Sequence, residues 1–248
     1  MYKLETKQVG MSFDGEPVIA DINIHVKPGE LVSLLGLSGS GKTTLFNCIA
    51  GIYKPVAGQI LLDGEDITGT SGHLSYMLQK DLLLPYYTIE DNVALPLVIR
   101  GAKKEAARAK AAPYFEEFGL AGTQKKYPHQ LSGGMRQRAA LLRTYLFSDN
   151  MALLDEPFSA LDTITKSAIH KWYLDVMEQI RLTTIFITHD IDEAILLSDR
   201  IYIMSGKPGR ITQEIVVTEP RMQRQGFNLT EKFLVYKRQI IEMLDMQA

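Results

Sequence analysis

Apolar and polar residues alternate near the start of the chain and then give way to short apolar runs. Between Ile22 and Val26, every second residue is apolar, which is the period of a half-buried strand. The run from Leu31 to Leu35 predicts a buried strand, and the turn residues Pro28 and Gly29 precede it. The pattern predicts further strands at residues 59–62, 74–78, 151–154, 183–188, 200–204 and 211–217.

Helical patterns are interspersed with these strands. They cover residues 42–50, 101–119, 136–147, 163–181 and 231–244. In the fourth of these segments an apolar residue recurs every four positions, and we expect these residues to form one apolar stripe. They are Ile164, Ala168, Trp172, Val176 and Ile180. Because strands and helices alternate on both sides of a mostly helical stretch near 81–150, the sequence predicts an α/β core with a helical insertion.

Composition restricts the class of protein. The 248 residues are 46% hydrophobic and 23% charged, which is ordinary for a globular protein and excludes a disordered chain, a collagen and a coiled-coil rod. A formal net charge of -2 argues against a nucleic-acid-binding polycation. No apolar run approaches the roughly 18 residues of a membrane-spanning helix. The first residues lack the apolar region of a signal peptide, and a single cysteine, Cys48, favours the cytosol.

A glycine-rich loop follows the predicted strand at 31–35 and precedes a predicted helix. It matches the phosphate-binding pattern G-x-x-x-x-G-K-[ST]. Its glycines let backbone N–H groups turn inward to hold an anion, and the helix N-terminus adds a favourable dipole. Lys42 can reach the terminal phosphates and Thr43 can bind Mg²⁺. We expect the loop to bind a nucleotide through Gly36, Leu37, Ser38, Gly39, Ser40, Gly41, Lys42, Thr43 and Thr44. Kinases, GTPases and ATPases all share this pattern.

Two adjacent carboxylates end the predicted strand at 151–154. Asp155 could hold Mg²⁺ through a water molecule, and Glu156 could orient and deprotonate an attacking water. Because adjacent carboxylates repel each other, a nearby metal ion would help to keep both ionised. The alternative, a surface turn with two solvated acids, is weakened by the presence of the phosphate-binding loop.

A second glycine motif, Leu131, Ser132, Gly133 and Gly134, stands just ahead of a helical run, where Ser132 can cap the helix. This segment resembles the LSGGQ signature of the ABC ATPases, with Met135 in place of the usual Gln. Four further motifs of that family appear in family order. They are the aromatic Phe13, the Q-loop glutamine Gln79, the D-loop Ser159–Asp162 and the switch histidine His189.

The resemblance implies a P-loop NTPase (RecA-like) α/β core, an N-terminal antiparallel β subdomain and an inserted α-helical subdomain. It implies that Phe13 stacks on adenine, that Glu156 is the general base assisted by His189 and Gln79, and that Thr43, Gln79 and Asp155 bind Mg²⁺. Two copies would pair head to tail as a homodimer. The segment Leu131–Gly134 and Asp162 would then contact the ATP that is held by the other copy.

The resemblance also suggests a branch of the family. The segment 82–95 after Gln79 and the segment 205–211 are similar to those of bacterial importers of nitrate, sulfonates, taurine and thiamine precursors. It implies a membrane permease and, indirectly, an extracytoplasmic substrate-binding protein as partners, no nucleic acid, and a location at the cytoplasmic face of the membrane. We expect four segments: the first half of the nucleotide-binding core at 1–80, a helical subdomain at 81–150, the second half at 151–220 and a helical tail at 221–248.

Three other functions remain open at this point. A soluble ABC ATPase usually carries tandem modules, long coiled-coil insertions or basic faces, none of which the sequence displays. A small-molecule P-loop kinase would not need the motifs at 131–134 and 159–162. An ATPase of an exporter is often fused to its membrane spans. The hypothesis favoured by the sequence is the ATP-hydrolysing subunit of a bacterial importer. The sequence names no solute, and the helix at 231–244 could pack on its own core or on a partner.

Overall fold

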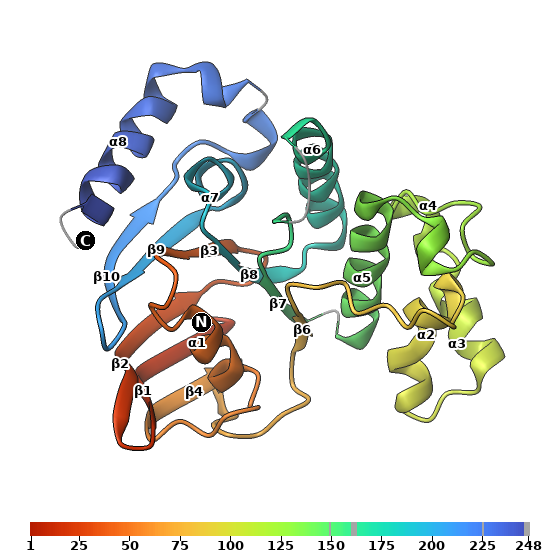
Figure 1. The fold of residues 1–248 in the computed structure, drawn as a ribbon, viewed down its shortest axis with the longest axis horizontal. Helices are drawn as coiled ribbons and strands as arrows, with labels where there is room; N and C mark the ends of the chain where they lie inside the picture. The colour runs from red at the N-terminus through yellow and green to blue at the C-terminus, as the bar shows by residue number, and fades with distance from the viewer. Residues whose placement is uncertain (149, 160–162, 225, 246–248) are drawn as a thin grey trace. The chain divides into compact units, whose positions relative to one another are not determined.

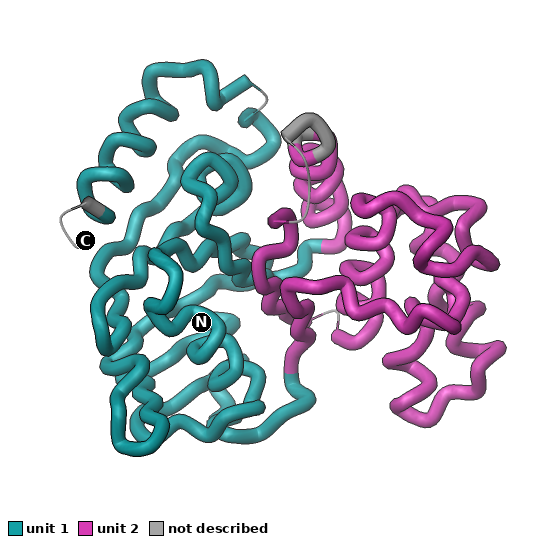
Figure 2. The backbone as a smooth tube through the Cα atoms, viewed as in Figure 1, with its two compact units in different colours: residues 1–73, 181–248 teal, residues 74–180 magenta. Residues whose placement is uncertain are grey.

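The structure is a computed structural model that describes residues 1–148, 150–159, 163–224 and 226–245 (Figure 1). The chain divides into two compact units (Figure 2). Unit 1 consists of Met1–His73 and Arg181–Ala248, and unit 2 is the continuous segment Leu74–Ile180. Unit 1 is therefore built from the two ends of the chain.

The first half of unit 1 forms an antiparallel sheet with the strand order β2-β1-β4-β5. Asp14 and Gly15 both have positive φ (51° and 84°), which gives the tight turn that a two-residue hairpin requires. One face of the sheet is buried. Its apolar side chains, each at most 3% exposed, include Leu4, Val9, Ile22 and Ile24. The strands are β1 (Leu4–Phe13), β2 (Glu16–Val26), β4 (Ala57–Leu62) and β5 (Glu65–Asp66).

Three parallel strands form the centre of unit 1. The strand β3 (Leu31–Gly36) lies between β8 (Thr183–Thr188) and β9 (Arg200–Ser205), and β10 (Arg210–Val216) runs antiparallel to β9. Every residue of β3, β8 and β9 is buried, which is why these strands read as continuous apolar runs rather than as alternating ones. The helices of unit 1 are α1 (Lys42–Ile49), α7 (Ile191–Leu197), α8 (Glu231–Asp245), η2 (Arg221–Gln223) and η3 (Phe227–Leu229).

The C-terminal helix α8 packs on the core of its own chain. Phe233 and Ile240 are at most 2% exposed and belong to one apolar cluster with Phe227, Ile215 and Ile195. The sequence left open whether this helix packs on its own core or on a partner. The structure shows that the helix face with Phe233 and Ile240 packs on its own core.

Unit 2 contains a short parallel strand pair and a set of helices. Met77 of β6 faces Leu154 of β7, so both strands end at the same edge. Helix α2 begins after Thr88, whose side chain accepts from the Asp91 N–H, and buried Asn92 bonds the backbone of Leu84. The elements are β6 (Ser75–Met77), α2 (Ile89–Ile99), α3 (Lys104–Ala111), α4 (Tyr114–Glu117), η1 (Pro128–Gln130), α5 (Gly133–Phe147), β7 (Met151–Asp155) and α6 (Thr163–Ile180).

Two sequence predictions for the helices need correction. The single helix expected at 101–119 is two helices, α3 and α4, separated at Ala112 and Pro113. The apolar stripe predicted on α6 is only partly inward-facing: Val176 is buried, Trp172 and Ile180 are half-buried, and Ala168 is exposed. The other buried positions among the side chains of α6 that the structure describes are Ile169, Tyr173 and Met177. A spacing of four residues drifts by about 40° per step on a helix with 3.6 residues per turn, so such a series cannot stay on one face. Ile164 lies outside the side chains that the structure describes.

In the described part of the chain, no helix combines the length and the apolar character needed to cross a membrane.

Candidate nucleotide-binding site

The phosphate-binding loop connects β3 to α1, as the sequence predicted. β3 ends at Gly36, and Gly41 caps the N-terminus of α1 with φ of 91°, a conformation that a residue with a side chain rarely adopts. Leu37, Ser38, Gly39 and Thr43 are exposed. The loop therefore presents its backbone and the start of a helix to solvent, which is the arrangement that binds phosphate.

Glycines also let the loop pack closely on the rest of unit 1. A Cβ atom at Gly36 would lie 2.1 Å from the carbonyl oxygen of Met204, and one at Gly209 would lie 1.9 Å from that of Ser40. Gly209 is bonded in turn to β2, because its N–H donates to Val18 O at 2.9 Å. Sequence reasoning missed Gly209 as part of the site; the Gly206–Gly209 turn was the available signal.

Lys42 lies inside the loop. Its side chain is largely buried, and its Nζ donates to the carbonyl oxygens of Gly36 at 2.8 Å and Leu37 at 2.9 Å. The ammonium group is thus held against the backbone that would surround a phosphate, and the loop carries its positive charge at its centre.

Phe13 lies at the end of β1, and its side chain is 40% exposed. Phe13 packs on Tyr53 in an edge-to-face arrangement. Their ring centroids are 5.4 Å apart, and the angle between the ring planes is 80°. Tyr53 follows α1, and its N–H donates to Asn47 O. The sequence indicated Phe13 as a stacking residue and missed Tyr53, which only its aromatic character could have suggested.

His189 directly follows the parallel strand β8, at the end of the sheet where the loop begins. Leu35 of β3 faces Thr188 of β8, so Gly36 and His189 are the next residues at the same end of two neighbouring strands. His189 is exposed. The side chain of Asp190 caps α7 by accepting from the N–H groups of Asp192 and Glu193, which fixes the backbone that follows the histidine.

In unit 2 a hydrogen bond joins two predicted catalytic residues. Gln79 Nε2 donates to Glu156 Oε2 at 2.8 Å. They meet because β6 and β7 are parallel and end together. Asp155 is 7% exposed at the end of β7, whereas Glu156 is only half-buried. Glu156 has φ of 46°, a left-handed conformation that costs free energy in a residue with a side chain and often marks a functional site.

The second glycine motif forms the N-terminus of α5. Ser132 is the N-cap, and its Oγ accepts from Met135 N–H at 3.3 Å. Ser132 and Gly133 are exposed, while Leu131 is buried and anchors the segment. This is a second exposed helix N-terminus, on a helix of 15 residues, suited to an anion. The D-loop residue Asp162 lies outside the described residues.

Two arginines of α5 hold the segment after Gln79, a feature that sequence reasoning missed. Arg136 Nε donates to Asp81 Oδ2 at 3.2 Å. Seven residues later, Arg143 donates from Nη2 to Asp81 O at 2.5 Å and from Nη1 to Leu82 O at 2.8 Å. Burial lowers the pKa of Arg143, and the charge of Asp81 opposes that shift. The helix that begins with the glycine motif is therefore bonded to the segment that follows Gln79.

The structure thus brings the predicted residues together in three places. The loop 36–44, Phe13 and His189 belong to unit 1, and Gln79, Asp155 and Glu156 meet in unit 2. The segment 131–134 is a separate exposed point of unit 2. The role of each residue stays a prediction.

Sequence comparison identifies relatives over most of the chain. Residues 19–159 match the ABC transporter family. The chain is 45% identical over 216 residues to the formylaminopyrimidine import ATP-binding protein ThiZ of Halalkalibacterium halodurans, which covers 87% of this chain and 84% of that protein. It is 39% identical over 228 residues to the aliphatic sulfonates import ATP-binding protein SsuB of Bacillus cereus, with 92% and 88% covered.

Solved structures are similar over most of the chain. The ATP-binding cassette MJ0796, a dimer in a post-hydrolysis state bound to ADP and Pi, matches with a TM-score of 0.73 and 29% identity, covering 88% of this chain and all of that one. The cbiO1 protein of Clostridium perfringens, part of the ABC transporter complex cbiONQ, matches with a TM-score of 0.80 and 26% identity, covering 96% and 99%. These matches confirm the predicted fold and importer group. The chain belongs to the ABC transporter family.

Proposed function

We propose that this chain is the ATP-hydrolysing subunit of a bacterial ABC importer. The observation that carries the proposal is the phosphate-binding loop, with Lys42 held at its centre and a helix N-terminus behind it. The import ATP-binding proteins among its relatives favour this function over a soluble ABC ATPase.

In this proposal unit 1 binds ATP. The loop 36–44 surrounds the phosphates, Lys42 exchanges its carbonyl partners for phosphate oxygens, and the exposed face of Phe13 stacks on adenine. His189 stands at the strand end beside the loop, where its side chain can contact the γ-phosphate.

Unit 2 supplies the general base. Glu156 takes a proton from the attacking water, and Gln79 orients its carboxylate through their hydrogen bond. The Thr43 hydroxyl, the amide oxygen of Gln79 and the Asp155 carboxylate would offer oxygen ligands to a metal ion, which is the donor set that Mg²⁺ prefers. When bound, Mg²⁺ would neutralise charge on the phosphates.

We further propose that two copies share two ATP molecules head to tail. Ser132 and Gly133 are exposed at a helix N-terminus, and Gly134 lies buried directly behind them, which is the arrangement expected if this segment contacts the nucleotide of the other copy. Leu131 anchors this segment, and Asp162 is proposed to lie at the same interface. The structure of the relative MJ0796 is a dimer.

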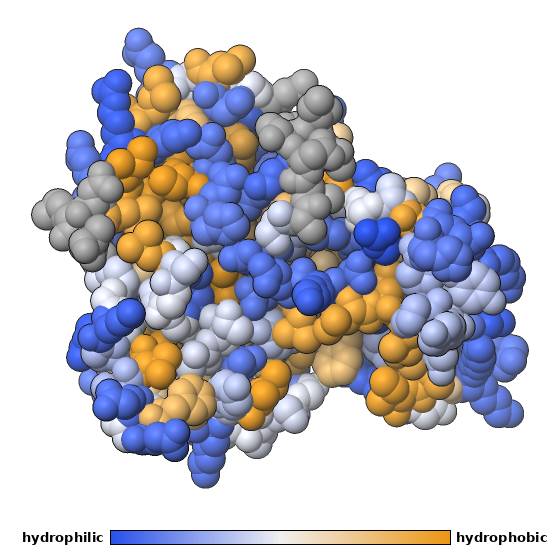
Figure 3. All heavy atoms as spheres, in the orientation of Figure 1, coloured by the Kyte–Doolittle hydropathy of each residue, from blue (hydrophilic) through white to orange (hydrophobic). Residues whose placement is uncertain are grey.

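The partners are proposed to be a membrane permease and, through it, an extracytoplasmic substrate-binding protein, which places this chain at the cytoplasmic face of the membrane. On the face drawn in Figure 3, hydrophobic and hydrophilic side chains are interspersed. In unit 2, large exposed apolar side chains follow Gln79 and offer a surface for the permease: Leu82, Leu84, Tyr86, Tyr87, Val98 and Ile99.

Because relatives at similar identity are named for different solutes, we propose that the permease and binding protein select the solute. The four-segment division at 1–80, 81–150, 151–220 and 221–248 stays a prediction.

Capture of the permease complex would test this proposal. Tagged Glu156→Gln protein is expressed in its native host and extracted in mild detergent with ATP, and its partners are identified by mass spectrometry. We expect one multispanning permease, and reconstituted complex with the unsubstituted chain should hydrolyse ATP. Lys42→Ala is the control, because it should retain the permease but lose ATP binding. Soluble partners alone, or no ATP hydrolysis by the complex, would overturn the proposal.

A further inference from the structure

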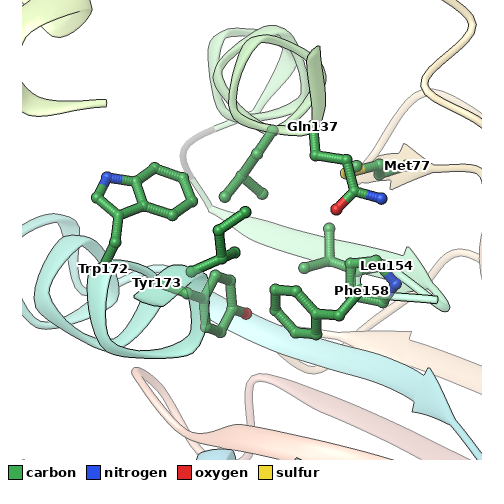
Figure 4. A pocket seen from close by; sticks show the side chains of 9 residues that line it. Met77, Gln137, Leu154, Phe158, Trp172 and Tyr173 are labelled. Carbon is green, nitrogen blue, oxygen red and sulfur yellow. The ribbon is translucent and has the colours of Figure 1, made fainter. Parts of the chain in front are cut away.

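A buried amide lies behind the predicted general base, in a small cavity of unit 2 (Figure 4). Gln137 stands on α5, and its side chain is 8% exposed. The cavity also receives side chains from β6, β7 and α6 and from residues 157 and 158. Its volume of about 10 Å³ is close to the least that one water molecule requires.

The side-chain amide of Gln137 lies among mostly apolar side chains. Its Oε1 finds no hydrogen-bond partner among the described residues. Figure 4 shows the amide directed toward Leu154, with Phe158 and Tyr173 on the opposite side of the cavity in this view. A buried acceptor without a donor destabilises a fold, and an apolar residue of similar size would fit this cavity better. We therefore expect this buried polar group to form its hydrogen bond in another state of the protein, such as the ATP-bound one.

The cavity borders the turn that carries Glu156. Pro157 and Phe158 line it and directly follow Glu156, whose left-handed backbone conformation must be held by its surroundings. Gln79 holds the carboxylate from one side, at 2.8 Å. Gln137 lines the same cavity as Pro157 and Phe158. The backbone N–H and the hydroxyl of Ser159 both donate to Glu156 O, at 3.2 and 3.0 Å, whereas Pro157 has no N–H to donate.

We propose that Gln137 is a positioning residue for Glu156. Its Oε1 accepts a hydrogen bond from one water molecule in the cavity, and that water bonds the backbone of the Glu156–Phe158 turn while ATP is bound. The inference rests on the proposed function and extends it. Since Gln137 and the exposed Ser132 belong to the same helix, contact of Ser132 with the other copy's ATP would also steady the base that acts on this copy's own ATP.

The test uses the complete permease complex and compares Gln137→Leu with two matched variants. Gln137→Leu fills the cavity without an acceptor. We expect its Tm to be equal or higher, its Kd for ATP to stay within about twofold, and its kcat to fall about tenfold or more with KM little changed. Gln137→Glu keeps an acceptor oxygen and should recover part of kcat. Leu141→Met, one turn further along α5 in the same cavity, changes packing alone and should leave kcat within about twofold.

A double-mutant cycle with Gln79→Ala separates positioning from packing. If both glutamines act through Glu156, the double variant will lose less than the product of the two single losses in kcat. Full kcat in Gln137→Leu, independent losses in the cycle, or a lower Tm together with lost ATP binding would each overturn the inference. These results are read against the unsubstituted complex. If that complex hydrolyses no ATP, the proposed function fails instead.

Discussion

Leu35 and Thr188 face each other across two neighbouring parallel strands, although they lie far apart in the sequence. The residue after each of them is a site residue, Gly36 on one strand and His189 on the other. Parallel pairing therefore sets the phosphate-binding loop and the histidine at one end of unit 1, and the buried strands hold both in place.

The position of His189 predicts the effect of removing its side chain. His189→Ala should lower kcat for ATP hydrolysis by roughly 10²-fold or more, because the group that we propose to contact the reacting phosphate and water is lost. The Kd for ATP should change little, since the loop 36–44 is intact. Steady-state ATPase rates and calorimetric titration with ATP measure the two effects. Equal losses in binding and rate would place His189 among the binding residues instead.

Substitution of Glu156 should trap the protein in its ATP-bound state. Glu156→Gln removes the proposed base but keeps a side chain of the same shape, so ATP should still bind while hydrolysis falls by about 10²- to 10⁴-fold. The ATP-bound dimer should then accumulate, as light scattering after gel filtration with ATP would reveal. Hydrolysis at the normal rate would disprove the assigned role.

Ser132 should act on the nucleotide of the other copy. Ser132→Arg should abolish hydrolysis, because a bulky cation replaces the exposed helix cap, while one isolated copy still binds ATP with unchanged Kd. The control is Lys42→Ala, which should lose binding in the isolated copy. Loss of ATP binding by an isolated Ser132→Arg copy would instead assign the serine to its own site.

Gly209 lies outside the loop 36–44, but its lack of a side chain should be needed for the loop to adopt its conformation. Gly209→Ala places a Cβ against Ser40 O and should cost about 1–3 kcal/mol of stability and weaken ATP binding. Gly10→Ala is the matched control, because the nearest atom to its Cβ lies at an ordinary 3.5 Å. Chemical denaturation and ATP titration of both variants would check this. Similar results for the two variants would contradict the close packing.

Cys48 should make stability depend on pH at the alkaline end. Burial raises the pKa of its thiol from 9.0 to about 11. Below pH 9 the thiol is protonated in both states and contributes nothing. Between pH 9 and 11 the unfolded chain loses the proton first, so the free energy of unfolding should fall with pH, by about 2–3 kcal/mol in all. Denaturation curves at pH 8, 9.5 and 11 would measure it, and Cys48→Ala should lack this part of the slope.

Local patterns predicted the backbone around the loop and the Ser132 cap better than the extent and buried faces of the helices, and the roles of the site residues stay predictions. The loop 36–44 and the cap Ser132 are set by a few adjacent residues, so their backbone conformations could be anticipated. The buried face of α6 depends on neighbours distant in sequence, and a simple spacing of four misplaced it. The close approach of Gly209 to Ser40, the pairing of Phe13 with Tyr53 and the burial of Gln137 are tertiary contacts that no local pattern encodes.

The division of unit 1 into two ends of the chain has a consequence for biosynthesis. During translation β3 and the loop after it emerge early, but both parallel neighbours of β3, namely β8 and β9, are made only after all of unit 2. Unit 2 is continuous and can fold on the ribosome first. The apolar strand β3 must wait unpaired in the meantime, so the nascent chain should be most prone to aggregation, and most dependent on chaperones, before residue 205 has left the exit tunnel.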